Sequence, residues 1–340
     1  MAEPLLEVKD LKVSFRTEDG VVRAVDGVSF TVDQGEVLGI VGESGSGKSV
    51  TMMSVLRLIS DPNMRVEGEV IYKGRDLMKL GKDEMQEVRG GEIAMIFQDP
   101  MTSLNPVYRV GDQIIEAIVT HQTLDKPAAK KRAVELLRQV GIPHAEARVD
   151  DFPHQFSGGM RQRAMIAMAL ANNPDILIAD EPTTALDVTI QAQIIELIDK
   201  LKDEFNSAVV LITHDLGVVA EIANEIIVMY AGRVVERAPK RQLFYDPQMP
   251  YTWGLLGSIP RLDRPRQERL HSIKGMPPSL IHVPEGCKFR PRCPHAFDKC
   301  MEEPELVNRV EEHGHLDRCW LSVAEKRRLR EETMTGEEAA

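Results

Sequence analysis

Residues 42–49 are the segment of this chain whose side chains and spacing most clearly indicate chemistry. They read Gly-Glu-Ser-Gly-Ser-Gly-Lys-Ser and match the whole Gly-x4-Gly-Lys-Ser phosphate-loop pattern. Glycines let backbone N–H groups converge on phosphate oxygens, and a helix that starts here adds the positive end of its dipole. Lys48 is expected to reach the β- and γ-phosphates of a nucleotide, and Ser49 to ligate Mg²⁺. The candidate phosphate-binding residues are Gly42, Ser44, Gly45, Ser46, Gly47, Lys48, Ser49 and Val50.

Two adjacent carboxylates follow a second apolar segment. Residues 176–179 read Ile-Leu-Ile-Ala and end in Asp180-Glu181. A buried strand that ends this way places its carboxylates at the carboxyl edge of a sheet, where α/β proteins bind nucleotides. Asp180 is expected to hold Mg²⁺ through water, and Glu181 to polarise the attacking water. Asp-Glu-Pro can also simply end a strand, but the phosphate loop in the same chain favours catalysis.

A second candidate phosphate-binding surface lies at residues 156–160, Phe-Ser-Gly-Gly-Met. Ser157 can act as the N-cap of a helix that begins with Gly158 and Gly159. The cap and a phosphate contact are compatible, because a capped helix start still presents N–H groups to an anion. We expect this surface to serve the nucleotide of another subunit rather than the one bound by its own chain.

The composition limits the class of protein. The chain has 340 residues, enough for one large domain and a smaller one, and a formal net charge of −11. The acidic balance argues against nucleic acid as the main partner. The sequence contains neither a run of roughly 18 apolar residues, as a spanning helix needs, nor a signal-peptide pattern at its start. We expect a cytosolic protein that can dock on a membrane protein.

The elements that position these residues follow from the apolar patterns. Alternation over residues 5–15 and 21–32, around Glu18-Asp19-Gly20, predicts an antiparallel hairpin. Apolar strands are predicted at 36–41, 93–97, 175–179, 208–212 and 225–229, and helices at 48–59, 128–140, 159–171, 188–204 and 216–223. Strands that alternate with helices indicate an α/β fold with a mostly parallel sheet covered by helices.

With these motifs in this order, the chain resembles the ATP-binding subunits of ABC transporters, which are P-loop NTPases. The resemblance makes Gln98 the Q-loop glutamine at the Mg²⁺ site, places Asp187 in the D-loop 185–187, and makes His214 the switch histidine. Taken alone, Gln98 or His214 would more often be structural, and their position among the other motifs supports the catalytic role. Phe15 falls where the family stacks an aromatic ring on adenine, although it can also be a core residue of its strand.

The resemblance also implies an architecture and a mechanism. The expected fold has a mixed sheet core, an antiparallel β subdomain and a helical insert at about 100–172. Two such domains pair head to tail, and each ATP lies between one phosphate loop and the partner's signature segment. His214 and Glu181 position the water, and the motion passes through the helical insert to membrane subunits. The common signature is Leu-Ser-Gly-Gly-Gln, so Phe156 and Met160 depart from it at both ends.

Longer segments look like the di- and oligopeptide permease branch, in particular its D-type ATPase subunits. These segments are residues 96–106, 153–160, 179–193, 275–278 and 287–294. The implied partners are a related F-type ATPase subunit in a heterodimer, two membrane-spanning permease subunits and a peptide-binding protein, at the cytoplasmic face of the bacterial inner membrane. Two alternatives stay open: an importer ATPase for another cargo, such as nickel, an antimicrobial peptide or a glycoside, and a soluble ABC ATPase that acts on nucleic acid.

All four cysteines fall in the last fifth of the chain: Cys287, Cys293, Cys300 and Cys319. Clustered thiols in a reducing cytosol are more often metal ligands than disulfides. Four thiolates could bind Zn²⁺ or an iron–sulfur cluster, or the residues could simply be buried. The family resemblance favours a [4Fe–4S] cluster over Zn²⁺, in a structural role.

We therefore expect three regions. Residues 1–246 form an ABC ATPase nucleotide-binding domain that contains the helical subdomain. Residues 247–322, which are rich in proline, form a small loop-rich C-terminal metal-binding domain. Residues 323–340 form a charged tail that is either a frayed helix or disordered.

Overall fold

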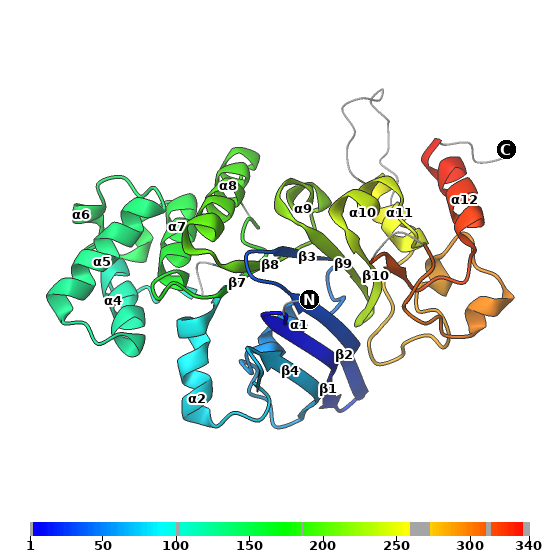
Figure 1. Ribbon diagram of the computed structural model, residues 1–340, viewed down its shortest axis with the longest axis horizontal. Helices are drawn as coiled ribbons and strands as arrows, with labels where there is room; N and C mark the ends of the chain where they lie inside the picture. Colours follow the sequence, from blue (N-terminus) through cyan, green and yellow to red (C-terminus); the bar gives the residue numbers. More distant parts are fainter. Residues whose placement is uncertain (1–2, 100–102, 185, 259–272, 311–313, 336–340) are drawn as a thin grey trace. The chain divides into compact units, whose positions relative to one another are not determined.

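The computed structural model describes residues 3–99, 103–184, 186–258, 273–310 and 314–335 (Figure 1). The chain divides into two compact units. The first comprises Met1–Leu6, Val32–Val37 and Tyr72–Ile212, and the second comprises Glu7–Thr31, Leu38–Ile71 and Thr213–Ala340. Parts of the predicted regions lie outside the described residues: 1–2 of the nucleotide-binding domain, 100–102 of the helical insert, Ala185 of the D-loop, 259–272 and 311–313 of the C-terminal domain, and 336–340 of the tail.

Parallel strands form the centre of the first unit. They are β6 (Ile93–Ile96), β7 (Ile176–Asp180) and β8 (Ala208–Thr213). β7 pairs with β6 on one side and with β8 on the other. Every residue of β7 and β8 is buried, which explains why both read as nearly continuous apolar runs. The register pairs Ile96 with Ala179, so the residues just beyond these two strands emerge together.

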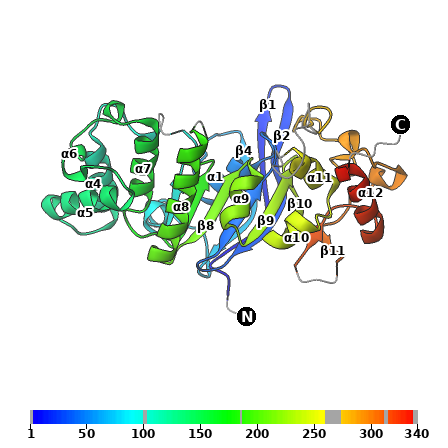
Figure 2. The ribbon, with the colours of Figure 1, turned by 90° about the horizontal axis from the view of Figure 1, so that it is seen from above.

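Helices make up most of the rest of the first unit. They are α2 (Lys82–Glu87), α4 (Val110–His121), α5 (Lys126–Gln139), α6 (Ala145–Arg148), α7 (Gly158–Ala169) and α8 (Val188–Phe205), beside the short strand β5 (Arg75–Asp76) and the turns Val88–Glu92 and Pro153–Gln155. Figures 1 and 2 both show α4, α5 and α7 side by side, and these helices pack on one another. α5 begins two residues before the predicted start, because Asp125 caps it by accepting a hydrogen bond from the Ala128 N–H at 2.9 Å.

The second unit contains the predicted hairpin. β1 (Leu6–Thr17) and β2 (Gly20–Val32) are neighbours in a sheet that β4 (Met64–Tyr72) joins beside β1. The sequence did not predict β4, because the first six residues of this strand lie outside the core and carry little apolar alternation.

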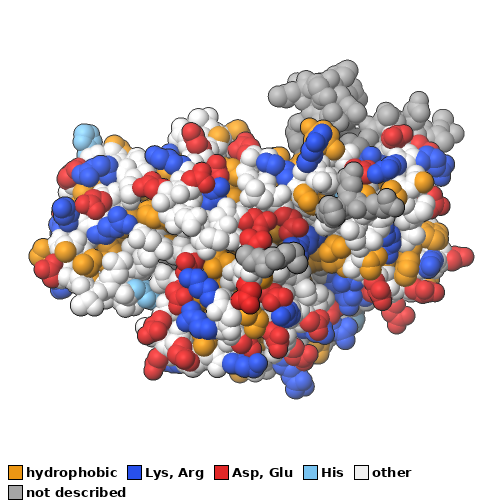
Figure 3. Space-filling view, viewed as in Figure 1, with side chains coloured by type: hydrophobic (Ala, Val, Ile, Leu, Met, Phe, Trp, Pro, Cys, Tyr) orange, Lys and Arg blue, Asp and Glu red, His pale blue; other side chains and the backbone are white. Residues whose placement is uncertain are grey.

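On the face of the molecule that Figure 3 draws, acidic and basic side chains are intermixed.

A mixed sheet is the other part of the second unit. β3 (Val37–Val41) runs parallel to β9 (Glu225–Tyr230), and β10 (Arg233–Pro239) runs antiparallel to β9. α1 (Lys48–Val55) follows β3, and α9 (Leu216–Ile222) precedes β9. The strand β10 was not predicted, because charged residues and a β-bulge between Val234 and Glu236 interrupt its apolar pattern.

The C-terminal region extends this mixed sheet. Its elements are α10 (Lys240–Tyr245), α11 (Pro250–Gly257), β11 (Val307–Asn308), β12 (Leu316–Asp317) and α12 (Val323–Thr335), with 3-10 turns at Arg290–Arg292 and Asp298–Met301. β12 pairs antiparallel with β10 and places Asp317 opposite Glu236. α12 packs against α11, and Figure 2 draws the two helices close together.

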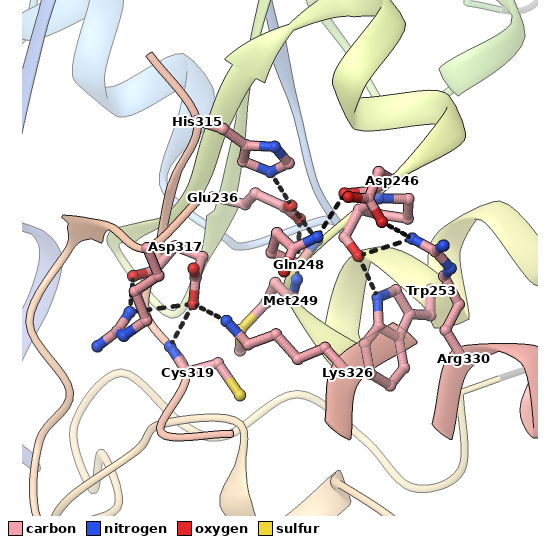
Figure 4. Close-up of polar contacts among 12 residues, drawn as sticks. Glu236, Asp246, Gln248, Met249, Trp253, His315, Asp317, Cys319, Lys326 and Arg330 are labelled. Carbon is pink, nitrogen blue, oxygen red and sulfur yellow. Dashed lines mark hydrogen bonds and ion pairs between the residues drawn. The ribbon is translucent and has the colours of Figure 1, made fainter. Parts of the chain in front are cut away.

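Glu236 ties this region to β10 (Figure 4). Its carboxylate is completely buried, accepts the backbone N–H groups of Gln248 and Met249, and hydrogen-bonds to His315 Nε2 at 2.7 Å. A buried carboxylate needs such partners, because removing it from water is otherwise costly. The Glu236 side chain therefore binds the segment that follows α10, at Gln248 and Met249, to strand β10.

Asp317 anchors the C-terminal helix in the same view. Its Oδ1 atom accepts from Lys326 Nζ at 2.6 Å, from the Cys319 N–H at 3.0 Å and from Arg309 Nη1 at 3.1 Å. The side chains of Asp317 and Lys326 are both completely buried. The sequence left the tail between a frayed helix and disorder; α12 is a helix, and Lys326 fastens its first turns to β12.

Candidate functional site

The predicted phosphate loop joins β3 to α1 in the second unit. α1 begins at Lys48, and its first turn holds no acidic side chain, so no carboxylate of that turn offsets the positive end of its dipole. Lys48 Nζ donates to the carbonyl oxygens of Gly42 at 2.7 Å and Glu43 at 3.1 Å, which places the ammonium inside the curl of the loop. Of the other predicted loop residues, Ser44 and Gly45 are exposed, Ser46 is buried, and Ser49 and Val50 are half-buried.

Two glycines give the loop its shape. Gly42 and Gly47 have backbone φ angles of 152° and 100°, values that residues other than glycine rarely adopt. A Cβ on Gly42 would lie 2.3 Å from the carbonyl oxygen of Met229, and a Cβ on Gly47 would lie 2.3 Å from that of Ala24. The loop thus packs against the backbones of β9 and β2, and a side chain at either glycine would force the loop away from them.

The carboxylate pair lies in the first unit, where the strands place it. Asp180 is the last residue of β7 and is 5% exposed. Glu181 Oε2 accepts hydrogen bonds from Gln98 Nε2 and from Thr184 Oγ1, both at 2.9 Å. Glu181 has φ of 46°, a strained value for a residue with a side chain, and strain of this kind collects at functional sites. The structure therefore brings Gln98 and Glu181 together, 83 positions apart in the chain.

The signature segment starts α7, also in the first unit. Ser157 is the N-cap and accepts from the Met160 N–H at 3.3 Å, as the cap interpretation predicted. Phe156 is buried, whereas Ser157 and Gly158 are exposed. A Cβ on Gly159 would lie 3.2 Å from the Ile190 side chain of α8, so this side chain would have to shift by a few tenths of an ångström to admit it. The substitution of phenylalanine for the usual leucine thus concerns core packing, and the serine and first glycine face solvent.

The remaining predicted residues occupy separate places. Asp187 is exposed and caps α8 by accepting from the Ile190 N–H at 3.0 Å. His214 is exposed and directly follows β8. Phe15 is half-buried on β1, on the same face as the buried Val13. Their catalytic and binding roles stay predictions.

The four cysteines line one cavity in the second unit, together with His295 and mostly apolar side chains. Cys300 and Cys319 are buried, and Cys287 and Cys293 are half-buried. Burial raises the pKa of the Cys293 and Cys319 thiols to about 12, because a thiolate is poorly solvated there. Among the described residues, no three His, Cys, Asp or Glu side chains converge in a way that could hold a metal ion. The predicted metal centre is thus not shown.

Three side chains at these places were missed by the sequence analysis. Thr184 contacts Glu181, and both Tyr251 and Arg292 contact Glu43 of the phosphate loop. The spacing of three residues between Glu181 and Thr184 lets a turn bring the two side chains together, so the sequence contains a signal for this contact. Nothing in the sequence indicates the other two, which lie more than 200 positions from the loop.

Comparisons with known proteins define the class. Residues 25–184 match the family "ABC transporter", and residues 235–300 match "Oligopeptide/dipeptide transporter, C-terminal region". A solved dimeric ATP-binding cassette in a post-hydrolysis state, bound to ADP and Pi, is 30% identical with a TM-score of 0.63, over 69% of this chain and 99% of that one. The phosphate loop, the carboxylate pair and this fold make the protein an ATPase of the ABC transporter class.

Two relatives narrow the class further. The oligopeptide transport ATP-binding protein OppD of Bacillus subtilis is 54% identical over 318 residues, which cover 93% of this chain and 88% of the relative. The dipeptide transport ATP-binding protein DppD of Lactococcus lactis subsp. cremoris is 52% identical, over 94% of this chain and 91% of the relative. The chain belongs to the family of oligopeptide and dipeptide transport ATP-binding proteins. In the described ranges, the helices are too short or too polar to cross a membrane.

Proposed function

We propose that this chain is the ATP-hydrolysing, energy-coupling subunit of an ABC importer for oligopeptides or dipeptides. The observation that carries the proposal is the hydrogen-bonded group of Gln98, Glu181 and Thr184 beyond the parallel strands. A carboxylate held by two donors has a fixed direction and can accept a proton from water that attacks a γ-phosphate. The peptide cargo is supported by the names of the relatives and by the family match over residues 235–300.

The nucleotide-binding roles that we propose are those that the sequence predicts. Lys48 and the loop amides bind the β- and γ-phosphates, and Ser49, Gln98 and Asp180 hold Mg²⁺ directly or through water. Mg²⁺ supplies charge that offsets the developing negative charge on the phosphate oxygens. His214 contacts the γ-phosphate, and Phe15 stacks on adenine. The half-buried ring of Phe15 and the exposed imidazole of His214 support these two roles, because a fully buried side chain could not reach a ligand.

The partner surface that we propose is the exposed start of α7 with Leu186 and Asp187 beside it. Ser157 and Gly158 are exposed, and a Cβ on Gly158 would lie 3.9 Å from Leu186, the neighbour of Asp187. Their N–H groups and the helix dipole suit the γ-phosphate of an ATP held by a second ATPase. We infer a head-to-tail heterodimer with a related F-type subunit, on two membrane-spanning permease subunits at the inner face of the bacterial plasma membrane, served by a peptide-binding protein.

The function is tested by purifying the chain with its co-expressed transporter subunits and reconstituting them in lipid vesicles. We expect the permease subunits to co-purify, and we expect ATP hydrolysis to rise when the binding protein carries a peptide. Lys48→Ala is the matched control and should abolish the stimulated rate. Association that nuclease treatment destroys, with no permease subunit bound, would contradict the importer assignment.

We also propose that the cysteine cavity holds a [4Fe–4S] cluster rather than Zn²⁺. Four thiols around one cavity form an all-thiolate set, which suits either centre, and the family resemblance favours the cluster. Cys287, Cys293, Cys300 and Cys319 would be the ligands, and the centre would brace the loops that carry them. Iron and acid-labile sulfide in anaerobically purified protein are expected. Stoichiometric zinc without sulfide would overturn the proposal.

A further inference from the structure

Glu43, the second residue of the phosphate loop, is held at each of its hydrogen-bonding groups. Its backbone N–H donates to the hydroxyl of Tyr251 at 2.8 Å. Its carbonyl oxygen accepts from Lys48 Nζ at 3.1 Å and from the Ser46 N–H at 3.2 Å. Its carboxylate is bound by Arg292. The phosphate-loop pattern leaves this position open to any residue, so the pattern alone does not require such anchoring.

Arg292 binds both carboxylate oxygens of Glu43 with the two ends of its guanidinium. The distances are 2.6 Å from Nη1 to Oε2 and 2.9 Å from Nη2 to Oε1. The Arg292 side chain is only 5% exposed, and that of Glu43 is 26% exposed. The guanidinium also donates to the backbone carbonyls of residues 273, 274 and 275, which fixes its orientation. Two-pronged pairs of this kind are among the strongest and most direction-specific hydrogen bonds of side chains.

Three buried aromatic rings support this contact. Tyr230, Tyr251 and Phe289 are each at most 2% exposed and lie 4.7–5.4 Å apart, measured between ring centroids. They come from the end of β9, from α11 and from the cysteine-bearing segment. The guanidinium carbon of Arg292 lies 5.8 Å from the centroid of the Tyr230 ring. Packed rings allow little movement, so the Tyr251 hydroxyl and Arg292 reach Glu43 from a rigid base.

We propose that Arg292 is a positioning residue of the phosphate loop. Arg292 neutralises the Glu43 carboxylate beside the bound triphosphate and, together with Tyr251, holds the loop in the shape that binds phosphate. This inference rests on the proposed nucleotide site. An unpaired carboxylate in a phosphate loop repels the like charges of ATP, whereas a paired one does not. Arg292 directly precedes Cys293, so the contact also makes the cysteine-bearing segment part of the nucleotide site.

The test compares ATP dissociation constants of Arg292→Gln, Arg290→Gln and the double variant Glu43→Gln/Arg292→Gln with that of the wild type. Arg290 is the matched control, because it lies in the same 3-10 turn and its guanidinium contacts Met301. We expect Arg292→Gln to bind ATP at least tenfold more weakly, a change of about 1.4 kcal/mol. Arg290→Gln should bind like the wild type. The double variant should recover to within about threefold of the wild type, because it lacks the unpaired carboxylate.

Salt separates a charge effect from a purely structural one. Raising the salt from about 0.1 M to about 0.5 M should reduce the deficit of Arg292→Gln relative to the wild type, because the repulsion is screened. The proposal is overturned if Arg292→Gln binds ATP like the wild type, or if the double variant binds as weakly as Arg292→Gln. If the wild type binds no ATP, the proposed function fails and this inference with it. Wild-type binding that Lys48→Ala abolishes keeps the proposed function, whatever the Arg292 variants show.

Discussion

Replacing Lys326 by methionine should loosen the C-terminal helix. The change keeps most of the side-chain volume and removes the ammonium that contacts Asp317 at 2.6 Å. Both side chains are completely buried, so the carboxylate of Asp317 would stay in a dry site with one donor fewer. Burial raises the pKa of Asp317 and the Lys326 ammonium opposes that rise, so losing the ammonium should favour the protonated carboxyl further.

The size of the effect follows from what remains around Asp317. Breaking a buried ion pair costs about 3–5 kcal/mol when one partner is left behind. Arg309 and the Cys319 N–H still donate to Asp317, at 3.1 Å and 3.0 Å, so we expect the lower end, about 3 kcal/mol. For a unit of this size, that loss lowers the melting temperature by roughly 6–12 °C.

The assay is a thermal melt combined with hydrogen exchange over residues 323–332. Lys326→Met should lower the melting temperature and speed exchange in α12. The double variant Asp317→Asn/Lys326→Met should recover most of the loss, because it leaves no buried unpaired charge. The matched control is Arg328→Met in the same helix, where the side chain is 68% exposed and little change is expected. If Lys326→Met melts like the wild type with unchanged exchange in α12, the reasoning about the buried pair is refuted.

Three further changes probe the nucleotide loops. Gly47→Ala should weaken ATP binding at least tenfold, because its Cβ would meet the Ala24 carbonyl. Gly45→Ala strains a φ of 77° in the same way but meets no atom within 4 Å, so it should do less, and equal losses in a binding titration would contradict this. Asp187→Ala should destabilise α8 by about 1 kcal/mol, because the N-cap is lost, whereas Asp187→Ser keeps a capping oxygen and should not. Hydrogen exchange over residues 188–191 measures the difference, and identical exchange in the two variants would refute the contribution of the cap. Gln98→Ala should slow ATP hydrolysis about tenfold or more, because Glu181 loses a donor, and an unchanged rate would remove Gln98 from the site.

The central strands and loops were predictable because their sequences carry local signals. β7 and β8 are buried on both faces, so their apolar runs stand out, and Gly42 and Gly47 stand at positions where a side chain would clash with backbone. The pairing of Gln98 with Glu181 follows from two adjacent parallel strands ending together. For these elements the residue types and their spacing are enough to predict the local structure.

Contacts formed between distant segments could not be predicted. Glu236 and Lys326 are charged residues that look exposed in the sequence, but each is completely buried because its partner comes from another element. For this reason the apolar pattern does not predict β10 and leaves α12 open between a frayed helix and disorder. Arg292 lies 249 positions from Glu43, and only the folded chain brings the two side chains together.

The measurement that tests the central claim most directly is ATP hydrolysis and ATP-dependent pairing of the Glu181→Gln variant with its partner ATPase. The claim is that Glu181 activates water at an ATP that two ATPase subunits enclose. The variant should bind ATP, remain in a closed pair, and hydrolyse ATP about 10²–10⁴-fold more slowly than the wild type, because glutamine cannot accept the proton. Hydrolysis at a near wild-type rate, or no pairing in ATP, would contradict the account.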